Sequence, residues 1–253
     1  MLRRFIRKQL NKQGFDIIKT NKARQWPQDF DELHRSIIQK SEPFTMTSPE
    51  RMFGLIEAVK YIQNNNIEGD IVECGVWKGG SMLAIAETLT RLNENNRKLF
   101  LYDTFEGMPP PSEADVSHMN QKAEDLLKTN EDKETNTVWA YSTLDTVKQT
   151  MMLSGYPEQK IQYVRGKVEE TIPEVIPQKI ALLRLDTDWY ESTRHELIHL
   201  FPLLARGGVL IIDDYGYWKG ARKAVDEYIA SNHIRILLNR MDDTGRIAIK
   251  LDQ

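Results

Sequence analysis

The feature that most constrains the fold is a regular alternation of short apolar runs with segments of helical periodicity, beginning near residue 69. Each apolar run is long enough for a strand and ends in a turn. Repeated β-α-β units of this kind predict an α/β fold with a doubly wound, mostly parallel sheet. The predicted strands span residues 70–74, 98–103, 161–165, 180–186 and 208–214, and the predicted helices include residues 48–64, 81–92, 144–155, 195–204 and 219–231.

The two ends of the chain depart from this alternation. At the C-terminal end, residues 234–238 and 246–251 predict a hairpin across the Asp-Asp-Thr-Gly turn at 242–245. The hairpin would add an antiparallel edge and complete a seven-stranded sheet. At the N-terminal end, residues 1–48 are polar and predict a helical arm or lid that precedes the main domain at 49–253.

Composition narrows the class of protein. The 253 residues are 40% hydrophobic and carry a formal net charge of −3, so a core can form and the basic face of a nucleic-acid binder is not expected. The single cysteine, Cys74, excludes an intrachain disulfide and favours a cytoplasmic location. No apolar run is long enough to span a bilayer. Residues 1–10 are basic and amphipathic, which predicts a solvated or dimer-packing helix, with a peripheral membrane helix as the alternative.

Polar residues at three predicted strand ends indicate a nucleoside-binding site, because ligands of doubly wound sheets bind at the carboxyl ends of the strands. A glycine turn and a helix N-terminus at residues 73–81 suit close approach of a ligand to the backbone. Asp103 can accept hydrogen bonds from ribose hydroxyls, and Gly166 and Val168 follow the third strand, where an adenine edge could rest. The alternative is that these are turns needed by any α/β fold. The glycine spacing is not that of a nicotinamide-dependent oxidoreductase.

Four aspartates follow the fourth and fifth predicted strands: Asp186 and Asp188 after one, Asp213 and Asp214 after the other. Both strand ends face the same edge of the sheet, and carboxylates at short range repel unless a cation compensates. Oxygen ligands suit Mg²⁺, Ca²⁺ or Mn²⁺ rather than zinc. We therefore predict Asp186, Asp213 and Asp214 as metal ligands and Asp188 as a general base. The alternative is that Asp188 and Asp214 cap the helices that follow.

A divalent cation at this position suits O-methylation. The methyl of a sulfonium is a good electrophile, whereas a neutral hydroxyl is a poor nucleophile. Coordination lowers the pKa of the hydroxyl, and a nearby carboxylate removes its proton. Aromatic residues surround the acidic strand ends, either as a wall for a sugar or flat aglycone or as packing of a lid or interface. They are Trp189, Tyr190, Tyr215, Tyr217 and Trp218.

Several of these segments together resemble the macrocin O-methyltransferase (TylF-like) family. They are residues 70–81 (DIVECGVWKGGS), 101–109 (LYDTFEGMP), 183–193 (LRLDTDWYEST) and 207–215 (GGVLIIDDY), with TMTS at 45–48 ahead of the first core helix. The resemblance covers about residues 40–230. It implies a class I, Rossmann-like methyltransferase that uses S-adenosylmethionine and Mg²⁺ to methylate sugar hydroxyls of natural products.

The resemblance also implies roles for individual residues. At the cofactor it implies Glu73, Gly75 and Ser81 near the methionine end, Asp103 at the ribose, and Thr45 and Met46 closing over it. At the metal it implies the same ligands as above, Asp186, Asp213 and Asp214, with Asp188 as the base. The chain carries Thr187 where the antibiotic-sugar members have glycine.

The partners implied by the resemblance are a small, sugar-containing acceptor and a second copy of the chain, since a homodimer formed through the arm is plausible. The polar stretch at residues 104–138, predicted as a loop plus a charged helix, would shape the acceptor pocket and leaves the acceptor open. Two alternatives remain: a catechol-type O-methyltransferase acting on an aromatic diol, and a non-catalytic cofactor-binding protein, against which the four aspartates argue.

Overall fold

The computed structural model describes residues 26–130, 132–133 and 137–251. The chain divides into two compact units, Met1–Asp31 and Glu32–Gln253. The helix expected at residues 1–10 lies outside the described residues. The second unit, which carries the fold and the site, begins within the expected arm, so residues 32–48 belong to it.

A seven-stranded sheet in the order β3-β2-β1-β4-β5-β7-β6 forms the centre of the second unit, counted over the described residues. The first five strands are parallel, and β7 pairs antiparallel with both β5 and β6. The predicted doubly wound sheet with a C-terminal antiparallel hairpin is therefore confirmed. The strands are β1 (Asp70–Cys74), β2 (Leu99–Asp103), β3 (Ile161–Arg165), β4 (Ile180–Leu185), β5 (Leu204–Ile212), β6 (Asn239–Arg240) and β7 (Arg246–Ile249).

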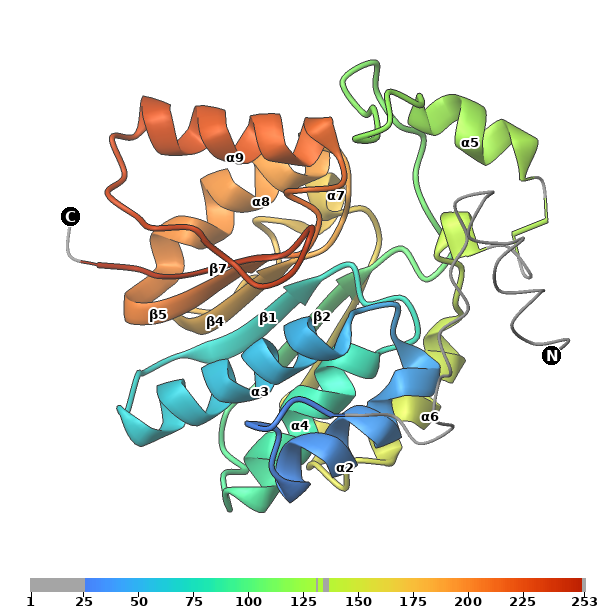
Figure 1. Ribbon diagram of the computed structural model, residues 1–253. Helices are drawn as coiled ribbons and strands as arrows, with labels where there is room; N and C mark the ends of the chain where they lie inside the picture. The colour runs from blue at the N-terminus through green and yellow to red at the C-terminus, as the bar shows by residue number, and fades with distance from the viewer. Residues whose placement is uncertain (1–25, 131, 134–136, 252–253) are drawn as a thin grey trace, which may run out of the picture. The chain divides into compact units, whose positions relative to one another are not determined.

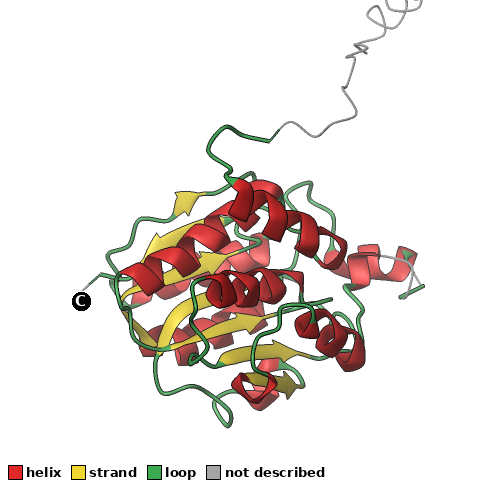
Figure 2. Ribbon diagram, turned by 90° about the horizontal axis from the view of Figure 1, so that it is seen from below, coloured by secondary structure: helices red, strands yellow, loops and turns green. Residues whose placement is uncertain are grey.

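Helices cover both faces of the sheet (Figure 1). On one face α3 packs against α2 and α4, and on the other α8 packs against α7 and α9. Figure 2, seen from below, shows helices lying across the strands. The helices are α2 (Glu32–Ser41), α3 (Pro49–Asn64), α4 (Gly80–Arg91), α5 (Ala123–Thr129), α6 (Leu144–Met152), α7 (Val168–Thr171), α8 (Tyr190–Leu200) and α9 (Lys219–Ser231), with 3₁₀ turns at Glu42–Phe44, Thr137–Trp139, Glu158–Lys160 and Phe201–Leu203.

The start of α3 follows from its local sequence. The Ser48 hydroxyl accepts a hydrogen bond from the Arg51 N–H at 3.2 Å, and Pro49 occupies the first helical position. Proline costs nothing there, because that N–H has no partner within the helix. This confirms the predicted helix start and fixes where Arg51 enters the site.

Three predicted elements are wrong in their bounds. The helix expected to reach residue 204 ends at Leu200, and β5 already begins at Leu204 instead of residue 208. Pro202 explains the break, because proline cannot donate a helical hydrogen bond. The strand expected at 234–238 is absent, and only Asn239 and Arg240 pair with β7 before the turn.

The strand register brings the site together. Cys74 of β1 is level with Leu185 of β4, which is level with Ile212 of β5. The residues after these three positions therefore leave the sheet side by side, at its carboxyl edge. This edge carries the glycine turn and both pairs of aspartates, as expected for a switch point in a doubly wound sheet.

Candidate functional site

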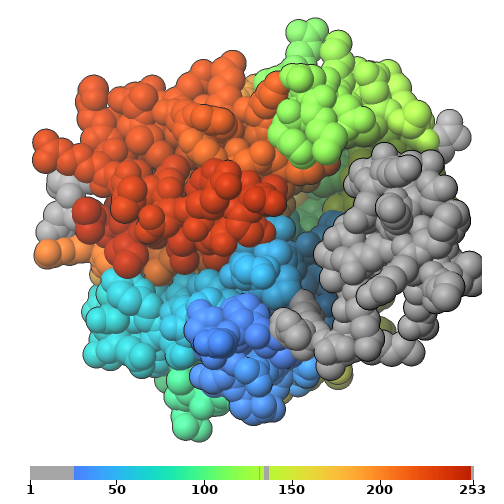
Figure 3. Space-filling model, viewed as in Figure 1, coloured from blue at the N-terminus to red at the C-terminus, as the bar shows by residue number. Residues whose placement is uncertain are grey.

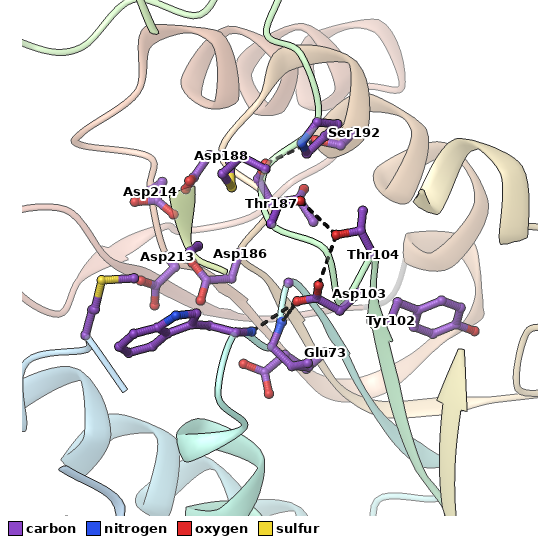
Figure 4. A pocket seen from close by; sticks show the side chains of 18 of the residues that line it. Glu73, Tyr102, Asp103, Thr104, Asp186, Thr187, Asp188, Ser192, Asp213 and Asp214 are labelled. Atoms are coloured by element: carbon purple, nitrogen blue, oxygen red, sulfur yellow. Dashed lines mark hydrogen bonds between the residues drawn. The ribbon is translucent and has the colours of Figure 1, made fainter. Parts of the chain in front are cut away.

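A cavity of about 360 Å³ lies at this carboxyl edge. Its volume is in the range of small-molecule sites. Every site residue predicted from the sequence lines it, although lining alone does not test the role of each. They are Thr45, Met46, Glu73, Gly75, Ser81, Asp103, Gly166, Val168, Asp186, Asp188, Asp213 and Asp214. Figure 4 shows Glu73 and Asp103 at one side of the pocket and the four aspartates of β4 and β5 at the other.

Glu73, near the end of β1, is a buried carboxylate with one unpartnered oxygen. Its side chain is 1% exposed, and its Oε1 pairs with the Arg184 guanidinium. Its Oε2 has no hydrogen-bond partner among the residues that the structure describes. Burial raises the pKa of Glu73 to about 7, although Arg184 opposes that effect. A buried acceptor in the cavity wall suits a cationic amino group of a ligand.

Gly75 is required by the close approach of the neighbouring strand end. Its φ is +83°, and a Cβ placed on it would lie 2.0 Å from the carbonyl oxygen of Asp186. The Gly75 N–H donates to Tyr102 O at 2.8 Å, and the Asp186 N–H donates to Cys74 O at 2.9 Å. The sequence predicted glycine for close approach of a ligand; the structure shows that it also lets the β1 and β4 turns touch.

Asp103, at the end of β2, organises the glycine turn. Its Oδ2 accepts hydrogen bonds from the backbone N–H groups of Val76 at 2.8 Å and Trp77 at 3.0 Å. Its Oδ1 accepts from the Phe105 N–H at 2.7 Å. Burial raises the pKa of this carboxyl, and the three backbone donors oppose the increase. Asp103 is thus a structural acceptor in addition to its predicted contact with a ribose.

The segment before α3 packs on the start of α4. A Cβ at Gly80 would lie 2.6 Å from the backbone of Phe44 and 2.8 Å from the Cβ of Thr45. Ser81, in the first turn of α4, is 4% exposed, whereas Met46 is 52% exposed. The predicted closing residues therefore border the cavity, with Met46 still open to solvent.

Three carboxylates form a compact acidic group, which we call the aspartate triad: Asp186, Asp188 and Asp214. One oxygen from each lies within 4.8 Å of the others. Burial raises the pKa of Asp188 to about 7, and the charges of Asp186 and Asp213 act in the same direction. Burial, followed by neighbouring carboxylates, also raises the pKa values of Asp186 and Asp214, although Arg184 lowers that of Asp186. A group of oxygen donors with this excess of negative charge fits a hard divalent cation.

Asp213, predicted as a metal ligand, lies outside the triad and is paired with two arginines. Its Oδ1 pairs with Arg184 and its Oδ2 pairs with Arg51, and the side chain is 7% exposed. Its carboxylate is therefore compensated by two guanidinium groups, whereas in the triad Asp186 shares Arg184 at 2.6 Å. The predicted ligand set and the observed triad share Asp186 and Asp214 and differ in the third carboxylate.

Two arginines are the functional residues that sequence reasoning missed. Arg184 is 2% exposed and contacts Asp186 at 2.6 Å and the Thr47 hydroxyl at 3.1 Å, besides Glu73 and Asp213. Its signal was available, because a charged residue within the apolar run of β4 must find partners. Arg51 pairs with Asp213 and, through Nε at 2.8 Å, with Asp242 of the hairpin turn. No local pattern in the sequence indicates that contact.

An aromatic and apolar cluster contains residues that follow the two acidic strand ends in the chain. The rings of Trp189 and Trp218 meet edge to face, 4.9 Å apart, and both are buried. They pack with residues of the 108–139 segment and with Tyr217. Ser117 pairs with Trp218 in an isolated β-bridge, and in Figure 3 the green segment lies against the orange and red C-terminal part. Trp189 and Trp218 thus pack the segment, and Tyr217 and Trp218 line the cavity, so a role of these two rings as a wall for the acceptor stays a prediction.

Among the helices that the structure describes, none combines the length and the apolar character needed to cross a membrane.

Comparison with known proteins places these features in a family. The sequence matches the family described as Macrocin-O-methyltransferase (TylF) over residues 3–248. It is 33% identical over 201 residues to the 8-demethyl-8-(2,3-dimethoxy-alpha-L-rhamnosyl)-tetracenomycin-C 4′-O-methyltransferase of Streptomyces olivaceus, covering 79% of this chain and 73% of the relative. It is 30% identical over 184 residues to the mycinamicin III 3″-O-methyltransferase of Micromonospora griseorubida, covering 73% and 69%.

A solved structure of another protein has a similar fold. The structure of the O-methyltransferase NovP superposes with a TM-score of 0.71 at 28% sequence identity and covers 83% of each chain. The similarity therefore extends over most of both chains.

Proposed function

The chain belongs to the macrocin O-methyltransferase family, and from this premise we propose that it methylates a sugar hydroxyl of a glycosylated small molecule with the help of Mg²⁺. Family membership makes it an S-adenosylmethionine-dependent O-methyltransferase. The sugar acceptor is supported by the names of two relatives, one of which specifies a rhamnosyl group and both of which specify a hydroxyl position.

The cofactor is assigned to the side of the cavity formed by β1 and β2. Glu73 would accept a hydrogen bond from the amino group of the methionine moiety through its unpartnered Oε2. Asp103 would bind the ribose while its backbone donors keep the carboxylate in place. Gly166 and Val168 would support the adenine, and Ser81, Thr45 and Met46 would border the methionine end. The methionine end of the cofactor would then lie in the same cavity as the triad.

The metal is assigned to the ends of β4 and β5. We assign Asp186, Asp213 and Asp214 to hold Mg²⁺, with Asp213 keeping its pairs with Arg51 and Arg184. When bound, Mg²⁺ supplies Lewis acidity that lowers the pKa of a coordinated hydroxyl and compensates the carboxylates. Asp188 would accept the hydroxyl proton, because it stands within the same group of oxygens. Trp218 and Tyr217 would exclude water on the acceptor side.

The observation that carries this proposal is the aspartate triad in the wall of the same cavity as Glu73 and Asp103. Three carboxylates within 4.8 Å of one another repel, and a fold retains such a group where a cation or a proton transfer uses it. In-line methyl transfer requires that acceptor oxygen, methyl and sulfur be held together. One cavity bordered by both groups meets that requirement.

The test is methyl transfer from labelled S-adenosylmethionine to a panel of acceptors, with Mg²⁺ and with excess EDTA. The panel contains deoxysugar glycosides with neighbouring hydroxyls and an aromatic diol as the catechol-type alternative. We expect label in a glycoside, with transfer lost in EDTA and restored by Mg²⁺, and transfer by Asp188→Asn slowed roughly 10²–10⁴-fold. Label in the aromatic diol alone would overturn the sugar assignment, and full activity in EDTA would overturn the metal assignment.

A further inference from the structure

The turn between β4 and α8 carries two of the three triad carboxylates one residue apart. Asp186 leaves β4, Thr187 follows, and Asp188 takes a φ of +68°, a left-handed conformation that L-residues with side chains adopt reluctantly. Figure 4 shows Thr187 between the two aspartates. A strained residue whose carboxylate belongs to the site must be held by its surroundings.

Thr187 is the residue through which the surroundings hold this turn. Its carbonyl accepts the Trp189 N–H at 2.7 Å and lies 3.4 Å from the Ser192 hydroxyl. Its own hydroxyl donates to Oε1 of Glu196 at 2.8 Å. The middle of the turn is therefore tied to α8 at both its backbone and its side chain.

Burying the carboxyl group of Glu196 costs folding free energy, because the group is removed from water. It lies on α8, is 0% exposed, and its Oε2 has no hydrogen-bond partner in the described part of the chain. Burial raises the pKa of this carboxyl well above its ordinary value, although the Thr187 hydrogen bond opposes that effect. The buried Cys74 thiol lies beside it, and its pKa is raised by burial and then by the charge of Glu196. An apolar side chain would pack here without this desolvation cost.

On the basis of the function proposed above, we propose that Thr187 and Glu196 form a positioning pair that fixes the Asp186–Thr187–Asp188 turn and thereby prepares the triad for a divalent cation. Neither side chain has to touch the cation. The pair acts as outer groups do at metal sites, where hydrogen bonds to the ligand-bearing segment orient the ligands.

The test uses Mn²⁺ as the probe, and measures its binding by the loss of the free-ion electron paramagnetic resonance signal, with S-adenosylmethionine affinity measured by calorimetry. Thr187→Val removes the hydroxyl at nearly constant shape, and we expect Mn²⁺ affinity to fall about 10-fold or more. Thr187→Ser keeps the hydroxyl and should restore affinity to within a few fold of the native protein. Thr88→Val is the control for loss of a threonine hydroxyl away from the site, since Thr88 is buried and donates within its own helix, to Ala84 O at 2.7 Å.

Two variants of Glu196 distinguish an effect on the position of the metal ligands from an effect on the stability of the fold. Glu196→Met removes the acceptor and the buried carboxyl together, so it should leave thermal stability equal or higher while weakening Mn²⁺ binding. Glu196→Gln keeps an acceptor for Thr187 without a charge and should retain most of the affinity. A merely structural role would instead move stability and Mn²⁺ affinity in the same direction.

The outcomes distinguish this inference from the function on which it rests. If the native protein binds neither Mn²⁺ nor S-adenosylmethionine, the proposed function fails. If it binds both, and Thr187→Val and Glu196→Met bind Mn²⁺ as the native protein does, the positioning role is overturned and the function stands. Should Thr187→Val not fold, Glu196→Met alone decides the question.

Discussion

The cofactor side and the acidic side of one cavity solve the problem of buried charge in different ways. On the cofactor side, Asp103 is held by three backbone N–H groups, and one oxygen of Glu73 is paired with Arg184. On the acidic side, the aspartate triad gathers three carboxylates, of which Asp186 shares Arg184 with Glu73 and Asp213, while Arg51 pairs with Asp213. The first side is therefore formed before any ligand arrives, whereas the second is left with negative charge that a cation would compensate.

The largest effect is expected from the acidic side, with Asp188→Asn. Removing a general base should lower the rate of methyl transfer roughly 10²–10⁴-fold, with S-adenosylmethionine affinity unchanged. Asp188 belongs to the triad but not to the predicted ligand set, and Asp213 belongs to the ligand set but not to the triad. Mn²⁺ binding distinguishes the roles of these two aspartates. We expect Asp188→Asn to bind Mn²⁺ and Asp213→Asn to bind it weakly. The reverse result would make Asp188 the ligand and Asp213 an ion-pair partner.

The variant Gly75→Ala tests the backbone contact between the cofactor side and the acidic side. The new Cβ would meet the Asp186 carbonyl at 2.0 Å in a backbone with φ +83°. We expect the free energy of unfolding to fall by roughly 3–5 kcal/mol, measured by urea denaturation. Gly155→Ala is the control, because Gly155 has a φ of +66° and nothing within 4 Å of its added Cβ. It should cost only about 1–2 kcal/mol. If the two variants lost equal free energy of unfolding, the turns after β1 and β4 could separate without cost, and the contact would not be a constraint.

The preformed character of the cofactor side is tested by Asp103→Asn. The amide would set its NH₂ against the backbone donors of the glycine turn. We expect a loss of roughly 1–3 kcal/mol in the free energy of unfolding without any ligand, together with weaker S-adenosylmethionine binding in calorimetry. Glu106→Gln, in the same loop but exposed, serves as the control. Native stability in Asp103→Asn would show that this side is organised by the cofactor.

The excess negative charge of the aspartate triad predicts that Asp214→Asn raises the free energy of unfolding, whereas Asp103→Asn lowers it. Removing one carboxylate of the triad should raise the stability of the metal-free protein, by about 1.4 kcal/mol for each pKa unit of repulsion relieved. We expect Mg²⁺ to raise the melting temperature of the native protein, and Asp214→Asn should abolish that rise. The exposed Glu113→Gln should change neither quantity. A destabilised, Mg²⁺-responsive Asp214→Asn would contradict the contrast between the two sides.

The smallest effect concerns Asp242, which supports Arg51 from the hairpin turn. Burial alone would raise its pKa, but hydrogen bonds from Ser48, Gly245 and Thr244 and the charge of Arg51 lower it below 3.8. A depressed folded-state pKa gives stability that is present above the unfolded value of 3.8 and is lost as the pH falls through the folded value. We expect Asp242→Asn to cost about 1 kcal/mol at pH 7 and progressively less below pH 3.8, by denaturation at several pH values. A difference that does not depend on pH would exclude the charge as the cause.

Much of this architecture could be predicted from local pattern. The apolar runs of β1, β2 and β4 are short, β-rich and bounded by turns, and the acids at their ends follow from the parallel arrangement. The start of α3 at Pro49 was readable from Ser48 because capping involves neighbours in the chain. The hairpin was expected at the correct place, but its first strand was misplaced, since the pairing of Asn239 and Arg240 depends on a tight turn at Asp242.

The sequence by itself determined the fold class, the edge of the sheet that carries the site and the residues that border the cavity. These depend on the period of the apolar pattern and on the residue types at the end of each strand, which are local properties. The tertiary structure decided how the charges pair: Arg51 with Asp213, Arg184 with Glu73, and Thr187 with Glu196. The partners in these pairs are 162, 111 and 9 residues apart in the chain. Pairing at such separations depends on the register of β1, β4 and β5 and on how the helices pack against them, and no local pattern contains that information.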